Sequence, residues 1–107
     1  MTYTLHSLSE VEEDVIRGYV WYEDKSPGLG EEFLRVFYTC AEELPRNPLL
    51  YPNVYRNFRR RLLRRFPYAI YFTIKDSQII VIGLFHCARN PRTIRLKLQT
   101  RKETERP

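Results

Sequence analysis

Residues 60–71 read RRLLRRFPYAIY, and here a dense basic run passes directly into an apolar run rich in aromatic residues. Aromatic and β-branched residues dominate residues 68–74 and return at 79–87, and the polar sequence KDSQ separates the two runs. Such a pattern predicts antiparallel strands joined by a hairpin turn. With residues 55–63 as a preceding run, the sequence predicts three consecutive antiparallel strands.

The third of these runs is apolar on both pleat faces apart from Gly83. A strand of this kind lies in the middle of a sheet, where both of its faces are covered. We expect helices on one face and a ligand surface or a partner on the other.

The residues before this basic run predict two helices. Apolar and polar residues alternate weakly over residues 2–6, as in a short strand. The Ser-x-x-Glu boxes of residues 7–12 begin a helix, and Ser26-Pro27-Gly28 ends it. Gly30 begins a second helix, which prolines at residues 45 and 48 stop. The predicted class is therefore α+β in the order β-α-α-β-β-β, with two antiparallel helices packed on a small, mainly antiparallel sheet. The aromatic residues at helical spacing are predicted to be core: Tyr19, Trp21, Tyr22, Phe33 and Phe37.

Charge is sorted along the chain. Residues 1–55 carry four basic and ten acidic side chains, whereas residues 56–107 carry fourteen basic and three acidic ones. Clustered arginines repel one another unless a counter-charge arrives, so the basic half favours an anionic partner, either nucleic acid or an acidic protein segment.

The composition excludes several other classes. No apolar run approaches the roughly 20 residues of a spanning helix and no secretory leader opens the sequence, which favours a cytoplasmic protein without membrane contact. Cys40 and Cys87 lie far apart within apolar stretches and are predicted to be buried thiols. The acidic cluster at residues 10–14 suits a helix N-terminus and not a metal site, so no metal and no cofactor is expected.

Four sequence pieces, in this order, resemble the RelE/ParE superfamily of bacterial type II toxins. They are residues 26–33 (SPGLGEEF), the loop from Asn47-Pro48 to Tyr51-Pro52, residues 60–71, and residues 86–91 (HCARNP). The resemblance covers roughly residues 2–92. It implies a RelE/ParE-like toxin domain at residues 1–92, followed by a basic tail at 93–107. Within the tail, Ile94, Leu96 and Leu98 alternate with polar residues, which predicts an edge strand or an induced structure before a disordered end.

The resemblance implies a small growth-inhibiting toxin that a cognate antitoxin neutralises, with operator DNA bound only through the antitoxin. ParE-like members block DNA gyrase, whereas RelE-like members cut messenger RNA on the ribosome. Between Asn47 and Lys75 the chain has no Glu, Asp, Lys or His, and arginine is a poor general base because it stays protonated. The sequence therefore favours the gyrase inhibitor. A RelE-like endoribonuclease, and a non-toxic module that only binds its antitoxin, remain as alternatives.

Five residues form the predicted surface for the target or the antitoxin. If the chain is RelE-like, His86 and Arg65 are the candidate catalytic residues, although His86 at the end of an apolar strand equally suits a structural role. Arg59, Arg61 and Arg65 share strand parity if the run stays extended. The predicted surface comprises Arg59, Arg61, Arg65, His86 and Arg89.

Overall fold

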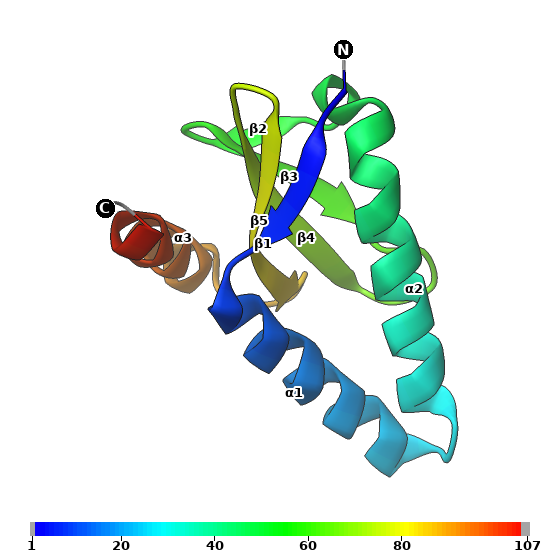
Figure 1. Ribbon diagram of the computed structural model, residues 1–107. Helices are drawn as coiled ribbons and strands as arrows, with labels where there is room; N and C mark the ends of the chain where they lie inside the picture. Colours follow the sequence, from blue (N-terminus) through cyan, green and yellow to red (C-terminus); the bar gives the residue numbers. More distant parts are fainter. Residues whose placement is uncertain (1, 106–107) are drawn as a thin grey trace.

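The computed structural model describes residues 2–105, and the side chains of residues 2–102. One sheet lies between a helical hairpin and a C-terminal helix (Figure 1). Its strand order is β1-β5-β4-β3-β2, with β1 parallel to β5 and every other pair antiparallel. The strands are β1 (Thr4–Ser7), β2 (Asn53–Tyr55), β3 (Phe58–Leu62), β4 (Tyr68–Lys75) and β5 (Gln78–His86). The predicted α+β class with a mainly antiparallel sheet is confirmed.

Helices α1 (Ser9–Lys25) and α2 (Leu29–Glu43) form the predicted hairpin. Gly28 makes the turn between them with φ of 90°, a left-handed conformation that suits glycine. The Glu23 carboxylate accepts hydrogen bonds from the backbone N–H groups of Gly28 and Gly30, each at 3.0 Å. A Cβ at Gly30 would lie 2.7 Å from the Tyr19 carbonyl oxygen, so glycine permits this close approach of the helices. Two short 3₁₀ turns, η1 (Leu44–Arg46) and η2 (Pro48–Leu50), then lead to the sheet.

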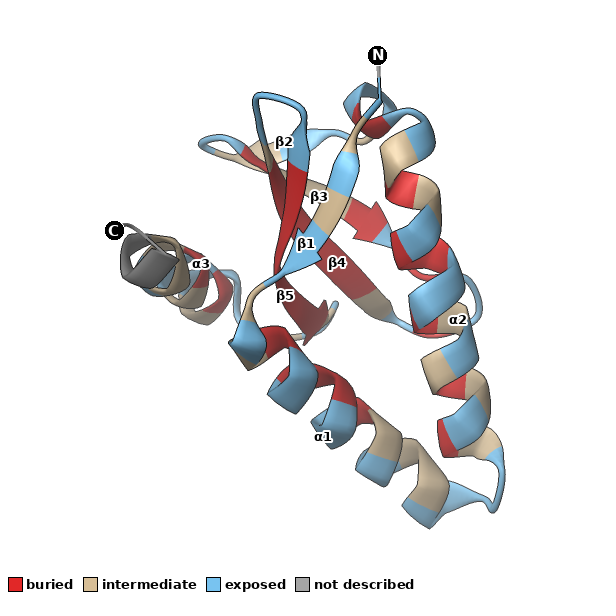
Figure 2. Ribbon diagram, in the orientation of Figure 1, coloured by how far each residue is buried: buried red, intermediate tan, exposed pale blue. Residues whose placement is uncertain are grey.

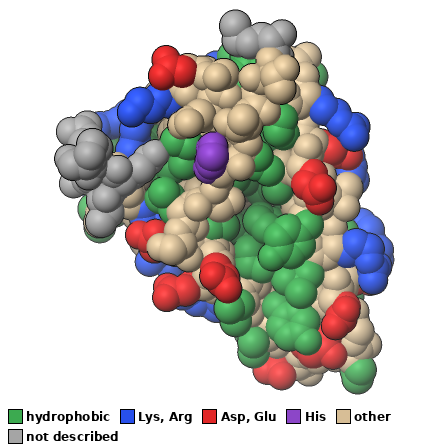
Figure 3. All heavy atoms as spheres, viewed as in Figure 1, with side chains coloured by type: hydrophobic (Ala, Val, Ile, Leu, Met, Phe, Trp, Pro, Cys, Tyr) green, Lys and Arg blue, Asp and Glu red, His purple; other side chains and the backbone are tan. Residues whose placement is uncertain are grey.

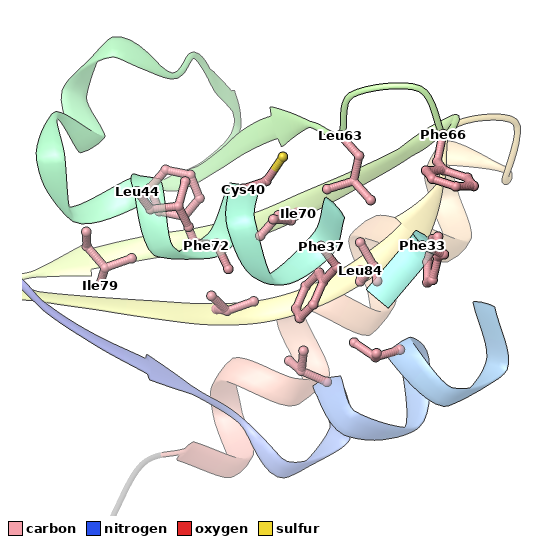
Figure 4. Close-up of a cluster of buried hydrophobic side chains, with 14 residues drawn as sticks. Phe33, Phe37, Cys40, Leu44, Leu63, Phe66, Ile70, Phe72, Ile79 and Leu84 are labelled. Carbon is pink, nitrogen blue, oxygen red and sulfur yellow. The ribbon is translucent and has the colours of Figure 1, made fainter. Parts of the chain in front are cut away.

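The main core fills the space between the helical hairpin and one face of the sheet (Figures 2 and 4). Phe33, Phe37 and Leu44 enter it from the helical side. Figure 4 shows them opposite side chains of β4 and β5 such as Phe72 and Leu84. A second core lies on the other face of the sheet; its buried members are Phe58, Ala69, Tyr71, Ile80, Ile82, Phe85, Ile94 and Leu98.

The predicted strand at residues 55–63 forms as β3, but it begins at Phe58, and Tyr55 belongs to an additional strand, β2. β2 and β3 pair with Tyr55 opposite Phe58, so that Arg56 and Asn57 form a two-residue turn. Arg56 has φ of 50°, the left-handed conformation that tight hairpins need. The predicted start of this strand was wrong because the polar pair at 56–57 turns the chain back on itself.

The predicted edge strand in the tail is also wrong. Residues Pro91–Glu105 form helix α3, and Ile94 and Leu98 pack on the second face of the sheet. A helix at this position buries both side chains because they are one turn apart. α3 thus covers the face of β5 for which a ligand or a partner was expected. The predicted disordered end begins at Thr100, but the helix extends to Glu105; residues 106–107 lie outside the described part of the chain.

Two smaller predictions need correction. Phe33 and Phe37 are buried as expected, and Tyr19 and Tyr22 are partly buried, but Trp21 is exposed on the outer face of α1. Cys40 is buried, whereas Cys87 is exposed, and both thiols are free. Cys87 follows the last residue of β5, where the chain leaves the sheet, so its apolar neighbours do not bury it.

Candidate functional site

Part of the basic cluster is neutralised within the chain. Glu43 of α2 pairs with Arg61 at 2.7 Å and with Arg64 at 2.8 Å. Glu32, also on α2, pairs with Arg65. The hydrogen bond from Arg61, with further help from Arg64, lowers the pKa of Glu43 below its ordinary value of 4.5. Helix α2 of the acidic N-terminal half therefore supplies the counter-charge to three arginines of the basic half.

Arg59 and Arg61 lie on the face of the sheet that α2 and its following turns cover. Arg61 is buried and donates to the Cys40 carbonyl oxygen at 2.9 Å, and Arg59 donates to the Tyr51 carbonyl oxygen at 2.6 Å. The two share a face, as their parity predicted. Arg65 leaves this pattern because it lies in the loop after β3, with φ of 68°.

Three arginines from separate elements meet at a cleft between α3 and the second face of the sheet. Arg60 comes from β3, Arg89 follows β5, and Arg95 belongs to α3. The Arg95 guanidinium carbon lies 5.5 Å from the centre of the Tyr55 ring, over which Arg56 also lies at 5.3 Å. We call this surface the arginine cleft. Its lining residues are Val54, Tyr55, Arg60, Tyr71, Cys87, Arg89, Pro91, Ile94, Arg95 and Leu98.

A buried ion pair holds α3 against the rest of the fold. Arg101 donates to the two carboxylate oxygens of Asp14 on α1, at 2.6 and 3.0 Å, and to the Ile82 carbonyl oxygen at 3.1 Å. The backbone N–H of Leu84 also donates to Asp14, at 3.1 Å. The bond to Asp14 raises the pKa of Arg101, which therefore stays charged. A Cβ at Gly83 would lie 3.2 Å from the Arg101 guanidinium and 2.5 Å from the Phe85 ring, so glycine leaves the space that both occupy.

His86 lies apart from the arginine cleft. Its ring packs edge-on against Tyr68, with 5.1 Å between ring centres, and Tyr68 in turn packs on Phe33 in the main core. The Nδ1 atom of His86 accepts a hydrogen bond from the Ala88 N–H at 3.0 Å, which leaves Nε2 to carry the ring proton. Burial raises the pKa of Tyr68 above its ordinary value of 10.0, so this phenol is protonated at neutral pH.

The structure therefore does not bring the five predicted site residues together. Arg89 lines the arginine cleft, whereas Arg59 and Arg61 lie on the opposite face of the sheet and Arg65 pairs with α2. Sequence reasoning missed Arg60 and Arg95. Arg60 could have been found from its position between Arg59 and Arg61, because successive side chains of a strand point to opposite faces of the sheet.

The visible face of the molecule carries an apolar region beside its helical hairpin (Figure 3). Figure 3 shows hydrophobic side chains gathered between α1 and α2 on the face in view, with acidic side chains around them. Within residues 2–105, no helix is long and apolar enough to cross a membrane. Among the described side chains, those of residues 2–102, no cluster of three or more His, Cys, Asp or Glu is placed to hold a metal ion.

Several solved structures from toxin-antitoxin systems have a similar fold. A chain of the chromosomal ParDE toxin-antitoxin system from P. aeruginosa superimposes with a TM-score of 0.73 at 16% identity, covering 79% of this chain and 96% of that one. E. coli toxin RelE, in a mutant form in the free state, gives a TM-score of 0.60 at 12% identity and covers 94% and 98%. A chain of the RelBE2 toxin-antitoxin complex from Mycobacterium tuberculosis gives 0.54 at 19% identity and covers 83% and 95%. The fold is thus the RelE/ParE-like fold that the sequence resemblance implied.

The sequence itself gives the narrower assignment. Residues 8–91 match the family described as the ParE toxin of the type II toxin-antitoxin system parDE. Toxin ParE2 of Mycobacterium tuberculosis is 22% identical over 102 residues, which cover 94% of this chain and 97% of that protein. The chain belongs to this family of toxins from type II toxin-antitoxin systems. Most of α3 lies beyond the matched residues.

Proposed function

We propose that this ParE-family toxin arrests growth by binding DNA gyrase and that it does not cut RNA. The observation that carries the proposal is the composition of the arginine cleft. Among its lining residues, all of which are described, every charged side chain is an arginine, and no histidine, lysine or carboxylate occurs. Gyrase is the target that the likeness to ParE toxins implies.

The chemistry of RNA cleavage explains why this composition matters. Attack of a 2′-hydroxyl on the adjacent phosphate needs a group that takes the hydroxyl proton, and cations that stabilise the charge on phosphorus. The arginines of the cleft supply the cations. They do not supply the base, because a guanidinium stays protonated. His86, a candidate base, lies on the opposite face beside Tyr68, and its Nδ1 is already bonded to the backbone.

A RelE-like endoribonuclease is the second candidate. Three arginines around one cleft suit the stabilisation of a phosphodiester, and His86 and Tyr68 form a pair of titratable rings at the end of β5. His86→Gln separates the two candidates, because it removes proton transfer and nearly keeps the shape of the side chain.

The test measures both activities on the same purified toxin. We expect it to inhibit supercoiling by gyrase and to leave ribosome-bound messenger RNA intact, and we expect growth arrest by His86→Gln to match that of the wild type. Cleavage of messenger RNA that disappears in His86→Gln would overturn the proposal. If neither activity appears and cells grow on induction, the chain is the non-toxic antitoxin-binding module.

A charge reversal locates the binding surface. The pair Arg60→Glu and Arg89→Glu should abolish growth arrest by making the arginine cleft acidic. Lys75→Glu reverses one exposed charge at the β4–β5 turn and serves as the control, which should still arrest growth. Equal arrest by the cleft variant and the control would show that the target binds elsewhere.

We propose that the same cleft receives an acidic segment of the antitoxin. The cleft lining has no carboxylate of its own, so carboxylates of a partner would supply the missing counter-charge. On this proposal the toxin contacts operator DNA only through the antitoxin. With gyrase as its target, the toxin acts in the cytoplasm.

A further inference from the structure

Tyr55 contacts the guanidinium groups of two arginines from different elements. It is the last residue of β2 and lines the arginine cleft. The guanidinium carbon of Arg56, in the turn after β2, lies 5.3 Å from the centre of its ring, and that of Arg95, on α3, lies 5.5 Å away. A cation this close to a tyrosine ring is attracted to it. The ring therefore holds together two cations that lie far apart along the chain.

The Tyr55 ring is itself fixed in place. Its hydroxyl donates to the Oε1 atom of Gln99 on α3, at 3.3 Å. On β3, the ring of the buried Phe58 is nearly parallel to it, with an interplanar angle of 7° and 6.0 Å between ring centres. A free arginine side chain samples many rotamers, and ordering it opposes binding. A fixed ring beside a guanidinium group reduces this loss of entropy before a partner arrives.

The N–H donors of Arg56 and Arg95 remain available to a partner. Among the described residues, no carboxylate lies within ion-pairing distance of either guanidinium group. An aromatic ring attracts the charge but does not replace the oxygen acceptors that a guanidinium group binds. Arg61 is the contrasting case, because its guanidinium carbon lies 5.5 Å from the centre of the Tyr51 ring but Glu43 already pairs with it. Tyr55 thus holds unpaired cations, whereas Tyr51 contacts a neutralised one.

The turn alone does not account for an arginine at position 56. Arg56 has φ of 50°, a left-handed conformation that glycine and asparagine adopt at lower cost. Its side chain is exposed, so core packing does not account for it either. Its contact with Tyr55 places a positive charge beside the arginine cleft.

We propose that Tyr55 is a positioning residue, and that Arg56 and Arg95, which it holds, bind neighbouring carboxylates of the acidic antitoxin segment. This inference rests on the proposed function, in which the arginine cleft receives that segment. Both guanidinium carbons lie within 5.5 Å of one ring centre, so they are no more than twice that distance apart. In an extended peptide, side chains two residues apart share a face and are about 7 Å apart. Two such carboxylates can therefore reach both guanidinium groups together.

The remainder of the lining favours a peptide over a nucleic acid. Apolar side chains share the arginine cleft with the arginines; they are Val54, Tyr71, Pro91, Ile94 and Leu98. Apolar side chains that lie between the carboxylates of a peptide can pack on such a lining, whereas a phosphodiester backbone carries none.

Binding of a labelled acidic peptide tests the site. The probe is fluorescein-labelled hexaglutamate, and fluorescence anisotropy with the purified full-length toxin at low salt gives its dissociation constant. Tyr55→Leu should weaken binding about fivefold or more, because both guanidinium groups lose the ring that holds them. Tyr55→Phe keeps the ring and should bind within about twofold of the wild type. Tyr51→Leu is the matched control: it removes the ring beside the neutralised Arg61 and should also stay within about twofold.

A cycle of substitutions separates positioning from general structural support. Arg56→Gln combined with Arg95→Gln should weaken binding about tenfold or more. Adding Tyr55→Leu to this pair should change the affinity by less than about twofold, because the ring acts through the two guanidinium groups. A further loss in this background would assign Tyr55 a structural role and refute the proposal. Weak binding by Tyr55→Phe would refute it equally, since the ring would then not be the group that matters.

A measurement on the wild-type toxin does not depend on how the variants fold. Nitrogen-15 relaxation of the arginine Nε–H groups reports how far each side chain is ordered. We expect Arg56 and Arg95 to be more ordered than Arg92, an exposed arginine of α3. Equal order in all three would show that Tyr55 does not hold them. If Tyr55→Leu does not fold, this comparison and the pair Arg56→Gln with Arg95→Gln decide the question, and unchanged peptide binding by the pair would contradict the proposed site.

The outcomes for this inference and for the proposed function are distinguishable. If Arg60→Glu with Arg89→Glu abolishes peptide binding but Tyr55→Leu does not weaken it, the cleft remains the acidic-segment site and the role of Tyr55 is refuted. If the cleft variant also binds like the wild type, both assignments fail. Labelled hexathymidylate is measured in parallel, and a loss in Tyr55→Leu that affects only this DNA would assign the site to nucleic acid instead. Gyrase inhibition is assayed separately and decides only the target of the toxin.

Discussion

Asp14 is buried on α1 and receives three hydrogen bonds, two of them from Arg101. Arg101→Met would leave the buried Asp14 carboxylate with two partners, the Leu84 N–H at 3.1 Å and the exposed guanidinium of Arg17 at 3.6 Å. We expect a loss of about 3–5 kcal/mol in the free energy of unfolding, as for other buried ion pairs that lose one partner. The double variant Asp14→Leu with Arg101→Met should lose less, because it removes both charges. Chemical denaturation measures both values. A double variant that is less stable than the single one would show that the buried carboxylate does not depend on Arg101 in this way.

Glu43 predicts a pH dependence of stability. Its pKa is lowered in the folded state, chiefly by the hydrogen bond from Arg61, so the ionised form stabilises the fold above the ordinary value of 4.5. This stabilisation is lost as the pH falls below 4.5 and through the folded-state pKa. The melting temperature of Glu43→Gln should therefore lie below that of the wild type at pH 7, and the difference should shrink in acid. Glu42→Gln, at an exposed neighbouring position, is the control and should show no such trend.

At the scale of elements, the helical hairpin is attached to the sheet through its apolar stripe. Phe37 is buried in the main core (Figure 4). Its neighbour Tyr38 is exposed. Phe37→Ala should lower the free energy of unfolding by about 3–5 kcal/mol, because the core cannot close fully around the lost ring. Tyr38→Ala should change it little. Equal effects of the two changes in thermal or chemical unfolding would mean that Phe37 does not belong to the core between α2 and the sheet.

Helix α3 gives a second test at this scale. Leu98 is 0% exposed and Leu96 is 66% exposed, as expected for a helix that packs on the sheet with one face. Leu98→Ala should cost about 2–5 kcal/mol of stability and Leu96→Ala less than 1 kcal/mol. In an edge strand the two residues would share a face, and the two changes would have similar effects.

At the scale of the whole molecule, charge should govern the encounter with the antitoxin. We expect the association rate to fall steeply from low to high salt, while the dissociation rate changes less, because attraction between an acidic segment and the arginine cleft accelerates the encounter. Stopped-flow measurements across a salt series give both rates. Arg60→Glu with Arg89→Glu should slow association and flatten its salt dependence, and Lys75→Glu should do neither. An association rate that does not respond to salt would refute this role of the cleft.

The order of the main elements follows from local sequence signals. Apolar spacing sets the extent of α1 and α2, and Ser26-Pro27-Gly28 ends the first helix through a glycine that adopts a left-handed turn. The strands at residues 68–75 and 78–86 follow from β-branched and aromatic runs on either side of a polar turn. These features act over a few residues, so composition and periodicity suffice to predict them.

The tail was decided by distant contacts. Ile94, Leu96 and Leu98 alternate like a strand, yet Ile94 and Leu98 also have the spacing of one helical turn. The helix prevails in the structure because it buries both side chains against the uncovered face of β5 and brings Arg101 to Asp14. These partners lie far apart along the chain, so sequence patterns over a few residues do not predict their contact.

The candidate site was decided in the same way. The sequence alone determined that the basic side chains cluster in the second half of the chain, and it included Arg89 in the predicted surface. Only the tertiary structure decided which arginines are neutralised and which remain at a cleft. Arg61 and Arg65 meet carboxylates of α2, whereas Arg60, one residue away on β3, lies on the other face beside α3. The physical reason is that a strand sends successive side chains to opposite faces, and the packing of the helices determines which face meets acidic groups.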